Sequence, residues 1–263
     1  MVESAKASND TGAALVTGAG TRIGAALARR LAVKGYAIIV HYNRSSDSAE
    51  QVAEAIRENG GRAEAMGANL LDRGARDKLI ENACRPFGPL TLLVNNASVF
   101  EPDSAETLRY DLWDAHFGLH AEAPMFLARD FAAQLPKGQK GNIVNIVDER
   151  VLRTSPGYFS YSLSKQVLFE ATRTLAQTLA PNIRVNAIGP GPTLPNSRQT
   201  DEQFAAEVAR LPLQQSATPG DIADTLLYLL QARSLTGQMI ALDGGEHLDF
   251  RRTGAITPAE RNE

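Results

Sequence analysis

Short apolar runs alternate with longer amphipathic stretches along most of this chain, and this alternation restricts its possible folds more than any other feature. Runs typical of strands lie at Ala13–Val16, Ala37–His41, Ala63–Met66, Leu92–Val94, Asn142–Val147, Arg184–Ile188 and Met239–Leu242. Stretches typical of helices lie at Ile23–Lys34, Ala49–Asn59, Arg73–Arg85, Ala121–Leu135, Tyr158–Leu179 and Asp221–Leu230. Continuous apolar runs favour strands that are buried on both faces. We therefore predict an α/β fold, a doubly wound parallel sheet flanked by helices.

No internal repeat, low-complexity region or Pro/Gly-rich linker divides the chain. We expect a single domain over residues 13–250, since a chain of 263 residues can form one large core without disulfide bonds. Residues 1–12 are small and polar, and we expect them to form a flexible N-terminal segment. Residues 251–263 are expected to form a polar C-terminal tail. The single cysteine, Cys84, fits a reducing compartment.

The composition argues against several classes of partner. The formal net charge is −3 and the basic residues are scattered, so the chain lacks the basic stripe that nucleic-acid binding needs. No apolar run approaches the roughly 20 residues of a membrane span, and residues 1–12 lack the apolar stretch of a signal peptide. We therefore expect a cytoplasmic protein that acts on a small molecule, without a membrane, a nucleic acid or a bound metal.

A glycine-rich segment follows the first predicted strand directly. It reads Thr17-Gly18-Ala19-Gly20-Thr21-Arg22-Ile23-Gly24, and a predicted helix begins within it. Glycines allow a tight turn and a close backbone approach, and the N-terminus of a helix offers unpaired N–H groups to a pyrophosphate. An incidental glycine-rich turn is the alternative. The position between a first strand and a helix favours a dinucleotide site.

The end of the second predicted strand indicates which dinucleotide is bound. Sites for NAD usually place an acidic residue here, about 20 residues after the glycines, to bind the ribose 2′-hydroxyl. This strand ends in His41-Tyr42-Asn43-Arg44-Ser45-Ser46, and no carboxylate occurs before Asp47. A guanidinium can bind a 2′-phosphate through two parallel hydrogen bonds. Arg44 and Arg22 are therefore candidates for a phosphate clamp, and NADPH is the expected cofactor. A solvated loop arginine is the alternative for Arg44.

Tyr161 and Lys165 form the candidate catalytic pair. They stand four residues apart in the predicted helix Tyr158–Leu179, so both side chains can point into one cleft. A free tyrosine has a pKa near 10, and a neighbouring cation is expected to lower it toward the range useful for proton transfer. This spacing occurs by chance in many helices. Its position after the glycine-rich segment favours a catalytic role.

Together these motifs resemble the short-chain dehydrogenase/reductase family. The shared features are the pattern T-G-x-x-x-G-x-G apart from Arg22, the segment Asn95-Asn96-Ala97-Ser98 in place of N-N-A-G, the Tyr-x-x-x-Lys pair, Ile183-Arg184-Val185-Asn186, Pro190-Gly191-Pro192 and Leu242-Asp243-Gly244-Gly245. The resemblance extends over roughly residues 13 to 246. It implies a Rossmann-like fold, a nicotinamide cofactor that supplies hydride, and a homotetramer.

The resemblance also implies the residues of the site. Contacts with NADPH are implied for Gly18, Thr21, Arg22, Ile23, Gly24, His41, Tyr42, Asn43, Arg44, Ser45, Asn69, Leu70, Asn95, Ala97, Ser98, Tyr161, Lys165, Pro190 and Gly191. Asn69 stands where an aspartate usually contacts the adenine, and an asparagine can still accept its hydrogen bond. His120 stands where many members carry the asparagine of a proton relay. It could support a similar relay or be purely structural.

Asp148 is the most informative departure from the family pattern. Most members carry a serine at this position, thirteen residues before the tyrosine, to orient a substrate carbonyl. An ionised carboxylate cannot donate a hydrogen bond to a ketone, but it can accept one from ring nitrogens and amino groups. A protonated Asp148 could instead pass a proton to nitrogen, and the sequence leaves its protonation state open, because burial raises a carboxyl pKa while the nearby Lys165 lowers it. Together with Arg22 and Ser98, this residue resembles the pteridine reductase branch. That likeness implies that Asp148, Tyr161 and Lys165 are catalytic, and that Arg22, Ser98, Phe100, Asp148 and Tyr161 contact a pterin, with Phe100 stacking on the ring.

Two other functions remain open. The first is an NADPH-dependent reductase of carbonyl compounds in the same family, acting on a sugar, a polyol or a 3-oxoacyl group. Asp148 argues against it, because such an enzyme is expected to carry serine there. The second is a regulator that senses NADPH without turnover. The intact Tyr161–Lys165 pair argues against this role, since a sensor needs no proton donor.

Overall fold

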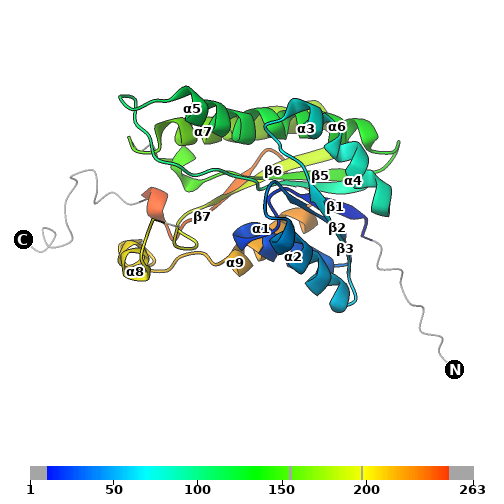
Figure 1. Cartoon of the computed structure of the whole chain (residues 1–263), viewed down its shortest axis with the longest axis horizontal. Helices are drawn as coiled ribbons and strands as arrows, with labels where there is room; N and C mark the ends of the chain where they lie inside the picture. The colour runs from blue at the N-terminus through cyan, green and yellow to red at the C-terminus, as the bar shows by residue number, and fades with distance from the viewer. Residues whose placement is uncertain (1–10, 154–155, 197, 249–263) are drawn as a thin grey trace, which may run out of the picture.

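A parallel sheet forms the centre of the molecule (Figure 1). The computed structural model describes residues 11–153, 156–196 and 198–248. Within these residues seven strands pair in the order β3-β2-β1-β4-β5-β6-β7, all parallel. The strands are β1 (Ala13–Val16), β2 (Ala37–Tyr42), β3 (Arg62–Gly67), β4 (Leu90–Asn95), β5 (Gly141–Ile146), β6 (Ile183–Pro190) and β7 (Met239–Leu242).

Helices cover both faces of this sheet (Figure 1). One layer contains α1 (Arg22–Val33), α2 (Ser46–Glu58) and α9 (Pro219–Gln231). The other contains α3 (Arg73–Asp77), α4 (Leu79–Phe87), α5 (Tyr110–Phe117), α6 (Ala123–Gln134) and α7 (Phe159–Leu179). Two separate clusters of buried apolar side chains lie between the sheet and these layers, one on each face. The predicted α/β fold, doubly wound and Rossmann-like, is therefore confirmed.

The predicted strands agree with the observed ones to within about two residues at each end. The predicted helix Arg73–Arg85 is wrong as a single element, because Lys78 separates α3 from α4. A π-helical turn, Gly118–Glu122, precedes α6. The predicted helices did not include α5 or α8 (Asp201–Val208), which carry no apolar stripe, because only His116 of α5 is buried and no residue of α8 is.

The strand order explains where a ligand can bind. From β1 the chain proceeds to β2 and β3 on one side, and β4 then pairs with the opposite edge of β1. The loops that follow β1 and β4 therefore diverge and leave a crevice beyond their carboxyl ends. The glycine-rich segment follows β1, and Asn96 follows β4.

The residues near the two ends of the chain lie mostly outside the described part of the structure. Most of the segment 1–12 and the tail 251–263 lie outside the described residues, so the domain boundaries stay predictions. No helix among the described residues is both long and apolar enough to cross a membrane.

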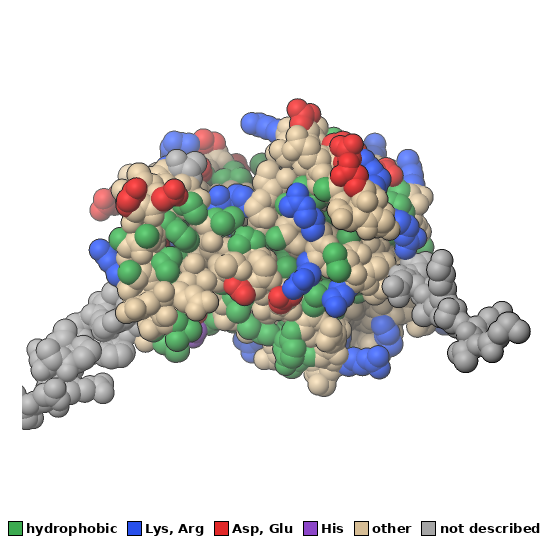
Figure 2. All heavy atoms as spheres, turned by 90° about the horizontal axis from the view of Figure 1, so that it is seen from below, with side chains coloured by type: hydrophobic (Ala, Val, Ile, Leu, Met, Phe, Trp, Pro, Cys, Tyr) green, Lys and Arg blue, Asp and Glu red, His purple; other side chains and the backbone are tan. Residues whose placement is uncertain are grey.

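Figure 2 views the side of α1, α2 and α9, where acidic and basic side chains are interspersed. This face therefore carries no stripe of a single charge.

Candidate active site

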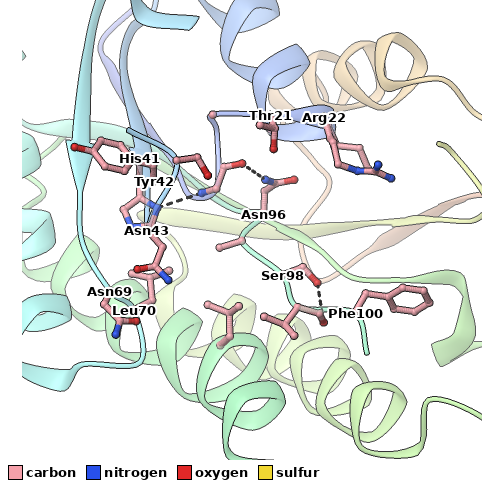
Figure 3. A pocket seen from close by; sticks show the side chains of 18 of the residues that line it. Thr21, Arg22, His41, Tyr42, Asn43, Asn69, Leu70, Asn96, Ser98 and Phe100 are labelled. Atoms are coloured by element: carbon pink, nitrogen blue, oxygen red, sulfur yellow. Dashed lines mark hydrogen bonds between the residues drawn. The ribbon is translucent and has the colours of Figure 1, made fainter. Parts of the chain in front are cut away.

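Two adjoining cavities lie beyond the carboxyl ends of the strands. The glycine-loop cavity, drawn in Figure 3, has a volume of about 400 Å³. The Tyr161 cavity has a volume of about 240 Å³. Five residues line both: Arg22, Ile23, Asn96, Ser98 and Phe100. A ligand can therefore extend from the glycine loop to Tyr161.

The backbone of the glycine-rich segment packs closely against the segment that follows β4. Gly18 has a φ of +63°, and a Cβ there would stand 2.9 Å from Ala97 Cα. A Cβ on Gly24 would overlap the Gly18 carbonyl oxygen and lie 2.6 Å from Asn96 Nδ2. Thr21 precedes α1 without capping it through its side chain. The first N–H groups of α1 are therefore available to an anion, as in a dinucleotide site.

The imidazole of His41 is hydrogen-bonded to the backbone of the glycine loop. The backbone N–H of Gly18 donates to His41 Nδ1 at 3.1 Å, and Nε2 lies 3.0 Å from the Ala68 carbonyl oxygen. Since Nδ1 accepts a hydrogen bond, the ring proton is on Nε2, which donates to Ala68. The side chain is 1% exposed, and burial lowers the pKa of His41 to about 4. His41 is thus a neutral strut for the loop, which the sequence motif did not indicate.

Most of the predicted cofactor residues line the glycine-loop cavity. They are Gly18, Thr21, Arg22, Ile23, Gly24, His41, Tyr42, Asn43, Ser45, Asn69, Leu70, Ala97 and Ser98. Arg44 is exposed and does not line it. The Arg22 guanidinium donates to the carbonyl oxygens of Pro195 and Leu194 at 3.0 and 3.3 Å. The structure therefore does not bring Arg22 and Arg44 together, and the phosphate clamp stays a prediction.

Asn95 and Asn96 point to different sides at the end of β4. Asn95 is buried and donates through Nδ2 to Asn145 Oδ1 at 2.8 Å, away from the glycine-loop cavity. Asn96 lines that cavity instead, and its Nδ2 donates to the carbonyl oxygens of Thr17 and Gly18 at 2.8 and 3.1 Å. The two side chains differ because successive residues at the end of a strand point to opposite sides, and a cofactor contact by Asn95 stays a prediction.

Tyr161, Lys165 and Asp148 meet in the Tyr161 cavity, as predicted. The Tyr161 hydroxyl donates to Asp148 Oδ2 at 2.7 Å. Lys165 Nζ donates to the carbonyl oxygen of Ile146, at the end of β5, at 2.9 Å. Pro190 and Gly191, at and just beyond the end of β6, line the same cavity. The helical spacing of four residues thus places the phenol and the ammonium in one cleft.

The electrostatics favour a protonated phenol. Burial raises the pKa of Tyr161 well above its ordinary value of 10.0, and the adjacent Asp148 carboxylate raises it further. Burial lowers the pKa of Lys165 to about 8, partly offset by Asp148. The expectation that the pKa of Tyr161 is lowered is therefore wrong for this structure. The cation that opposes burial and the carboxylate is Arg150, whereas Lys165 Nζ lies 5.7 Å from the ring centroid.

Both ring nitrogens of His120 are engaged in hydrogen bonds. The backbone N–H of Val99 donates to Nε2 at 3.2 Å, so the ring proton lies on Nδ1, 2.8 Å from Ser164 Oγ. Ser98 Oγ also lies 3.0 Å from Nε2. Burial lowers the pKa of His120 well below 6.5. His120 thus ties the loop after β4 to α7, which favours the structural role over a relay.

His116 lies one helical turn earlier and is held through one ring nitrogen, while its Nε2 is buried without a hydrogen-bond partner among the described residues. Its Nδ1 lies 2.7 Å from Ser160 Oγ, and Ser160 in turn donates to the Asp103 carboxylate. The rings of His116 and His120 meet Tyr161 edge-on, at centroid distances of 5.7 and 5.3 Å. The two histidines therefore form a rigid wall behind the phenol.

Phe100 lies in an aromatic cluster at the mouth of the Tyr161 cavity. Its ring stacks on Tyr158 at a centroid distance of 4.2 Å and meets Tyr161 edge-on at 4.8 Å. Figure 3 shows Phe100 and Arg22 on opposite sides of an opening, with Ser98 between them. This placement leaves room for a planar ring between the glycine loop and Phe100.

Sequence reasoning missed several residues that line the Tyr161 cavity. The main ones are Arg150, Gln199, Phe204 and Glu207. Gln199 Nε2 donates to Glu207 Oε2 at 2.6 Å. Phe204 and Glu207 lie in α8, and Gln199 lies just before it. The capping box formed by Thr200 and Gln203 was a sequence signal that could have located this helix. Among the described residues, no group of three or more His, Cys, Asp or Glu side chains could hold a metal ion.

Comparison with known proteins places this site in a large group of reductases. A family described as Enoyl-(Acyl carrier protein) reductase matches residues 18–247. The 3-oxoacyl-[acyl-carrier-protein] reductase of Synechocystis is 31% identical over 88% of this chain and 95% of its own length.

Solved structures show the same fold. FolM alternative dihydrofolate reductase 1 from Brucella canis, complexed with NADP, is 46% identical and has a TM-score of 0.90, covering 95% of this chain and 98% of its own. The angucycline C-6 ketoreductase LanV, with bound NADP, is 31% identical and has a TM-score of 0.85, covering 92% and 98%. These relatives differ in the substrates that their names imply.

Proposed function

Because the chain belongs to the short-chain dehydrogenase/reductase family, we propose that this oxidoreductase uses NADPH to reduce a dihydropterin or dihydrofolate. The observation that carries the proposal is Asp148, hydrogen-bonded at 2.7 Å to the catalytic tyrosine where the family usually has serine. The similarity to the dihydrofolate reductase FolM supports it.

The glycine-loop cavity fits NADPH. A Cβ at Gly24 would overlap the loop backbone, so this close packing of the loop requires glycine. The N-terminus of α1, which no side chain caps, suits a pyrophosphate. No carboxylate follows β2 before Asp47, so nothing at that position would repel a 2′-phosphate. When bound, the nicotinamide supplies the hydride. Lys165 and Tyr161 would lie beside its ribose, and Arg44 would contact the 2′-phosphate.

The remaining chemistry belongs to the residues of the Tyr161 cavity. Tyr161, held neutral by burial, donates its proton to the ring nitrogen next to the reduced carbon. Asp148 holds the phenol in place and accepts hydrogen bonds from the N–H groups of the substrate. Phe100 provides an aromatic face on which a pterin can stack. Arg22 and Ser98 lie at the junction of the two cavities, where they can contact both ligands.

A second candidate is the reduction of a carbonyl compound. The similarity to a 3-oxoacyl reductase and to the ketoreductase LanV favours it. A ketone oxygen needs hydrogen-bond donors, whereas the Asp148 oxygens accept hydrogen bonds from the Tyr161 hydroxyl and the Arg150 N–H. The NADPH-sensing role has no such observation in its favour.

Steady-state turnover tests the proposal directly. We expect NADPH oxidation with dihydrobiopterin or dihydrofolate, and a loss of about 10²–10⁴-fold in kcat for Tyr161→Phe, which removes the proton donor. Binding of NADPH to the variant should stay within about twofold of wild type, which separates chemistry from cofactor binding. Inert pterins, together with rapid reduction of 3-oxoacyl thioesters, would instead establish the second candidate.

Three wider expectations remain proposals: a cytoplasmic location, a homotetramer, and one domain over residues 13–250. The family resemblance supports the tetramer. Light scattering of the purified chain would test it, and a monomer in the presence of NADPH would refute it.

A further inference from the structure

Arg150 lines the Tyr161 cavity, although no motif pointed to it. It belongs to the short 3₁₀ turn Glu149–Val151 that follows β5, and Asp148 caps this turn. The Arg150 side chain is 24% exposed, and the residue lines the cavity. A largely buried guanidinium in a substrate cavity calls for a physical explanation, since desolvating a cation is costly.

The first contact of Arg150 is with Asp148. Its backbone N–H donates to Asp148 Oδ1 at 3.0 Å, and Nη1 lies 3.4 Å from both Oδ1 and Oδ2. These bonds fix the rotation of the carboxylate. Oδ2 is thereby directed at the Tyr161 hydroxyl, which donates to it at 2.7 Å.

The second contact is with the aromatic cluster. The Arg150 Cζ lies 5.3 Å from the ring centroid of Phe100 and 5.5 Å from that of Tyr158. The two rings are parallel, with an interplanar angle of 6°. Since the ring centroids are 4.2 Å apart and Arg150 Cζ is almost equidistant from them, the guanidinium packs beside this stack rather than over the faces of both rings. One guanidinium therefore touches the catalytic carboxylate and the ring on which we propose that the substrate stacks.

The neighbouring acid does not compete for Arg150 at neutral pH. Glu149 is 3% exposed, and burial, followed by the charges of Glu246 and Asp148, raises its pKa to about 8. Lys165 donates to a carbonyl oxygen rather than to a carboxylate. Asp148 is thus the carboxylate to which Arg150 is directly bonded in this cavity.

We propose that Arg150 is a positioning residue, which aligns Asp148 with the Tyr161 hydroxyl and braces Phe100 against the substrate ring. The part that concerns Phe100 rests on the proposed function, whereas the alignment of Asp148 applies to any substrate of the enzyme. Arg150 lines the Tyr161 cavity and not the glycine-loop cavity, so NADPH affinity is measured separately from turnover for each variant.

Two substitutions separate the charge of Arg150 from its shape. Arg150→Met removes the cation and keeps a flexible chain, and it should lower kcat by roughly tenfold to a hundredfold, the usual effect of losing a charge-assisted hydrogen bond. It should also raise the KM for dihydrobiopterin by at least about threefold, because Phe100 loses its brace. Arg150→Lys should recover part of the lost kcat, but its KM should stay close to the raised KM of Arg150→Met, because an ammonium keeps the charge without the planar contact.

The control is Arg85→Met, an exposed arginine on α4 whose ion pair with Glu81 lies on the surface. Activities are normalised to the number of NADPH-binding sites, so misfolded protein does not count. Wild-type turnover of dihydrobiopterin is measured first. If only ketones are reduced, the proposed function fails, and the kcat comparison is made with the ketone.

If Arg150→Met matches Arg85→Met in kcat per NADPH site, the proposal is overturned. It is also overturned if Arg150→Lys loses as much kcat per NADPH site as Arg150→Met, because the positive charge would then not be what aligns Asp148. A fall in kcat with unchanged NADPH affinity and partial rescue by lysine supports it.

Discussion

Acidification should weaken this protein through His41. The ring is neutral in the fold because burial lowers its pKa from 6.5 to about 4. A histidine whose pKa falls on folding takes up its proton more readily in the unfolded chain. The free energy of unfolding is therefore unaffected well above pH 6.5 and falls as the pH drops toward 4. Linkage gives a loss of about 2 kcal/mol at about pH 5 and about 3 kcal/mol at about pH 4 from this residue alone.

The variant His41→Gln isolates this contribution. A glutamine can accept from the Gly18 N–H and donate to the Ala68 carbonyl, yet it does not titrate. Urea unfolding, followed by the fluorescence of the single tryptophan, Trp113, gives the stability difference between wild type and variant. This difference should shift by about 2 kcal/mol in favour of the variant between about pH 7.5 and 5. The other buried histidines cancel, because both proteins contain them.

Arg85→Gln, on the exposed surface of α4, is the control and should keep a constant offset from wild type. Binding of NADP⁺ to the folded protein should change little over the same range, because a folded-state pKa of about 4 leaves roughly nine in ten His41 rings neutral at about pH 5. A stability difference that stays constant within about 0.5 kcal/mol across this range would refute the assignment of His41 as a buried neutral strut.

Three further predictions concern the two cavities. Gly24→Ala should weaken NADPH binding by at least about a hundredfold, measured by fluorescence titration, because the added Cβ collides with Asn96 and the loop backbone. Arg44→Asp should shift the kcat/KM preference from NADPH toward NADH by about tenfold or more, and an unchanged preference would remove Arg44 from the phosphate site. His120→Asn should lower the free energy of unfolding by about 1–3 kcal/mol, measured by urea unfolding, because its bonds to Ser98 and Ser164 are lost. A variant of unchanged stability would contradict that role.

The fold was predictable because its signals are local and repeated. Apolar runs such as Ile38-Ile39-Val40 are buried between helices, and they indicate strands whatever their partners are. The helices α5 and α8 were missed because little or nothing on them is buried, so no apolar stripe marks them. Their positions depend on contacts with distant segments, which a single sequence does not record.

The site was predictable where chemistry depends on spacing within one element. Tyr161 and Lys165 share a helix face, and Asp148 follows a strand that ends beside them. The role of Asn96 was missed because a motif does not say which of two neighbouring side chains faces the cavity. Arg150 carried no signal, because its contacts with Phe100 and Tyr158 join segments that are separate in the sequence.

Replacing Asp148 with serine, the residue that most family members carry at this position, tests the central claim most directly. The measurement is kcat/KM of wild type and Asp148→Ser for dihydrobiopterin and for a 3-oxoacyl thioester, under identical NADPH saturation. If Asp148 selects a pterin, the variant should lose about a hundredfold or more with dihydrobiopterin and should gain, or at least retain, activity with the thioester. A variant that reduces dihydrobiopterin as well as wild type does would contradict this account of the site.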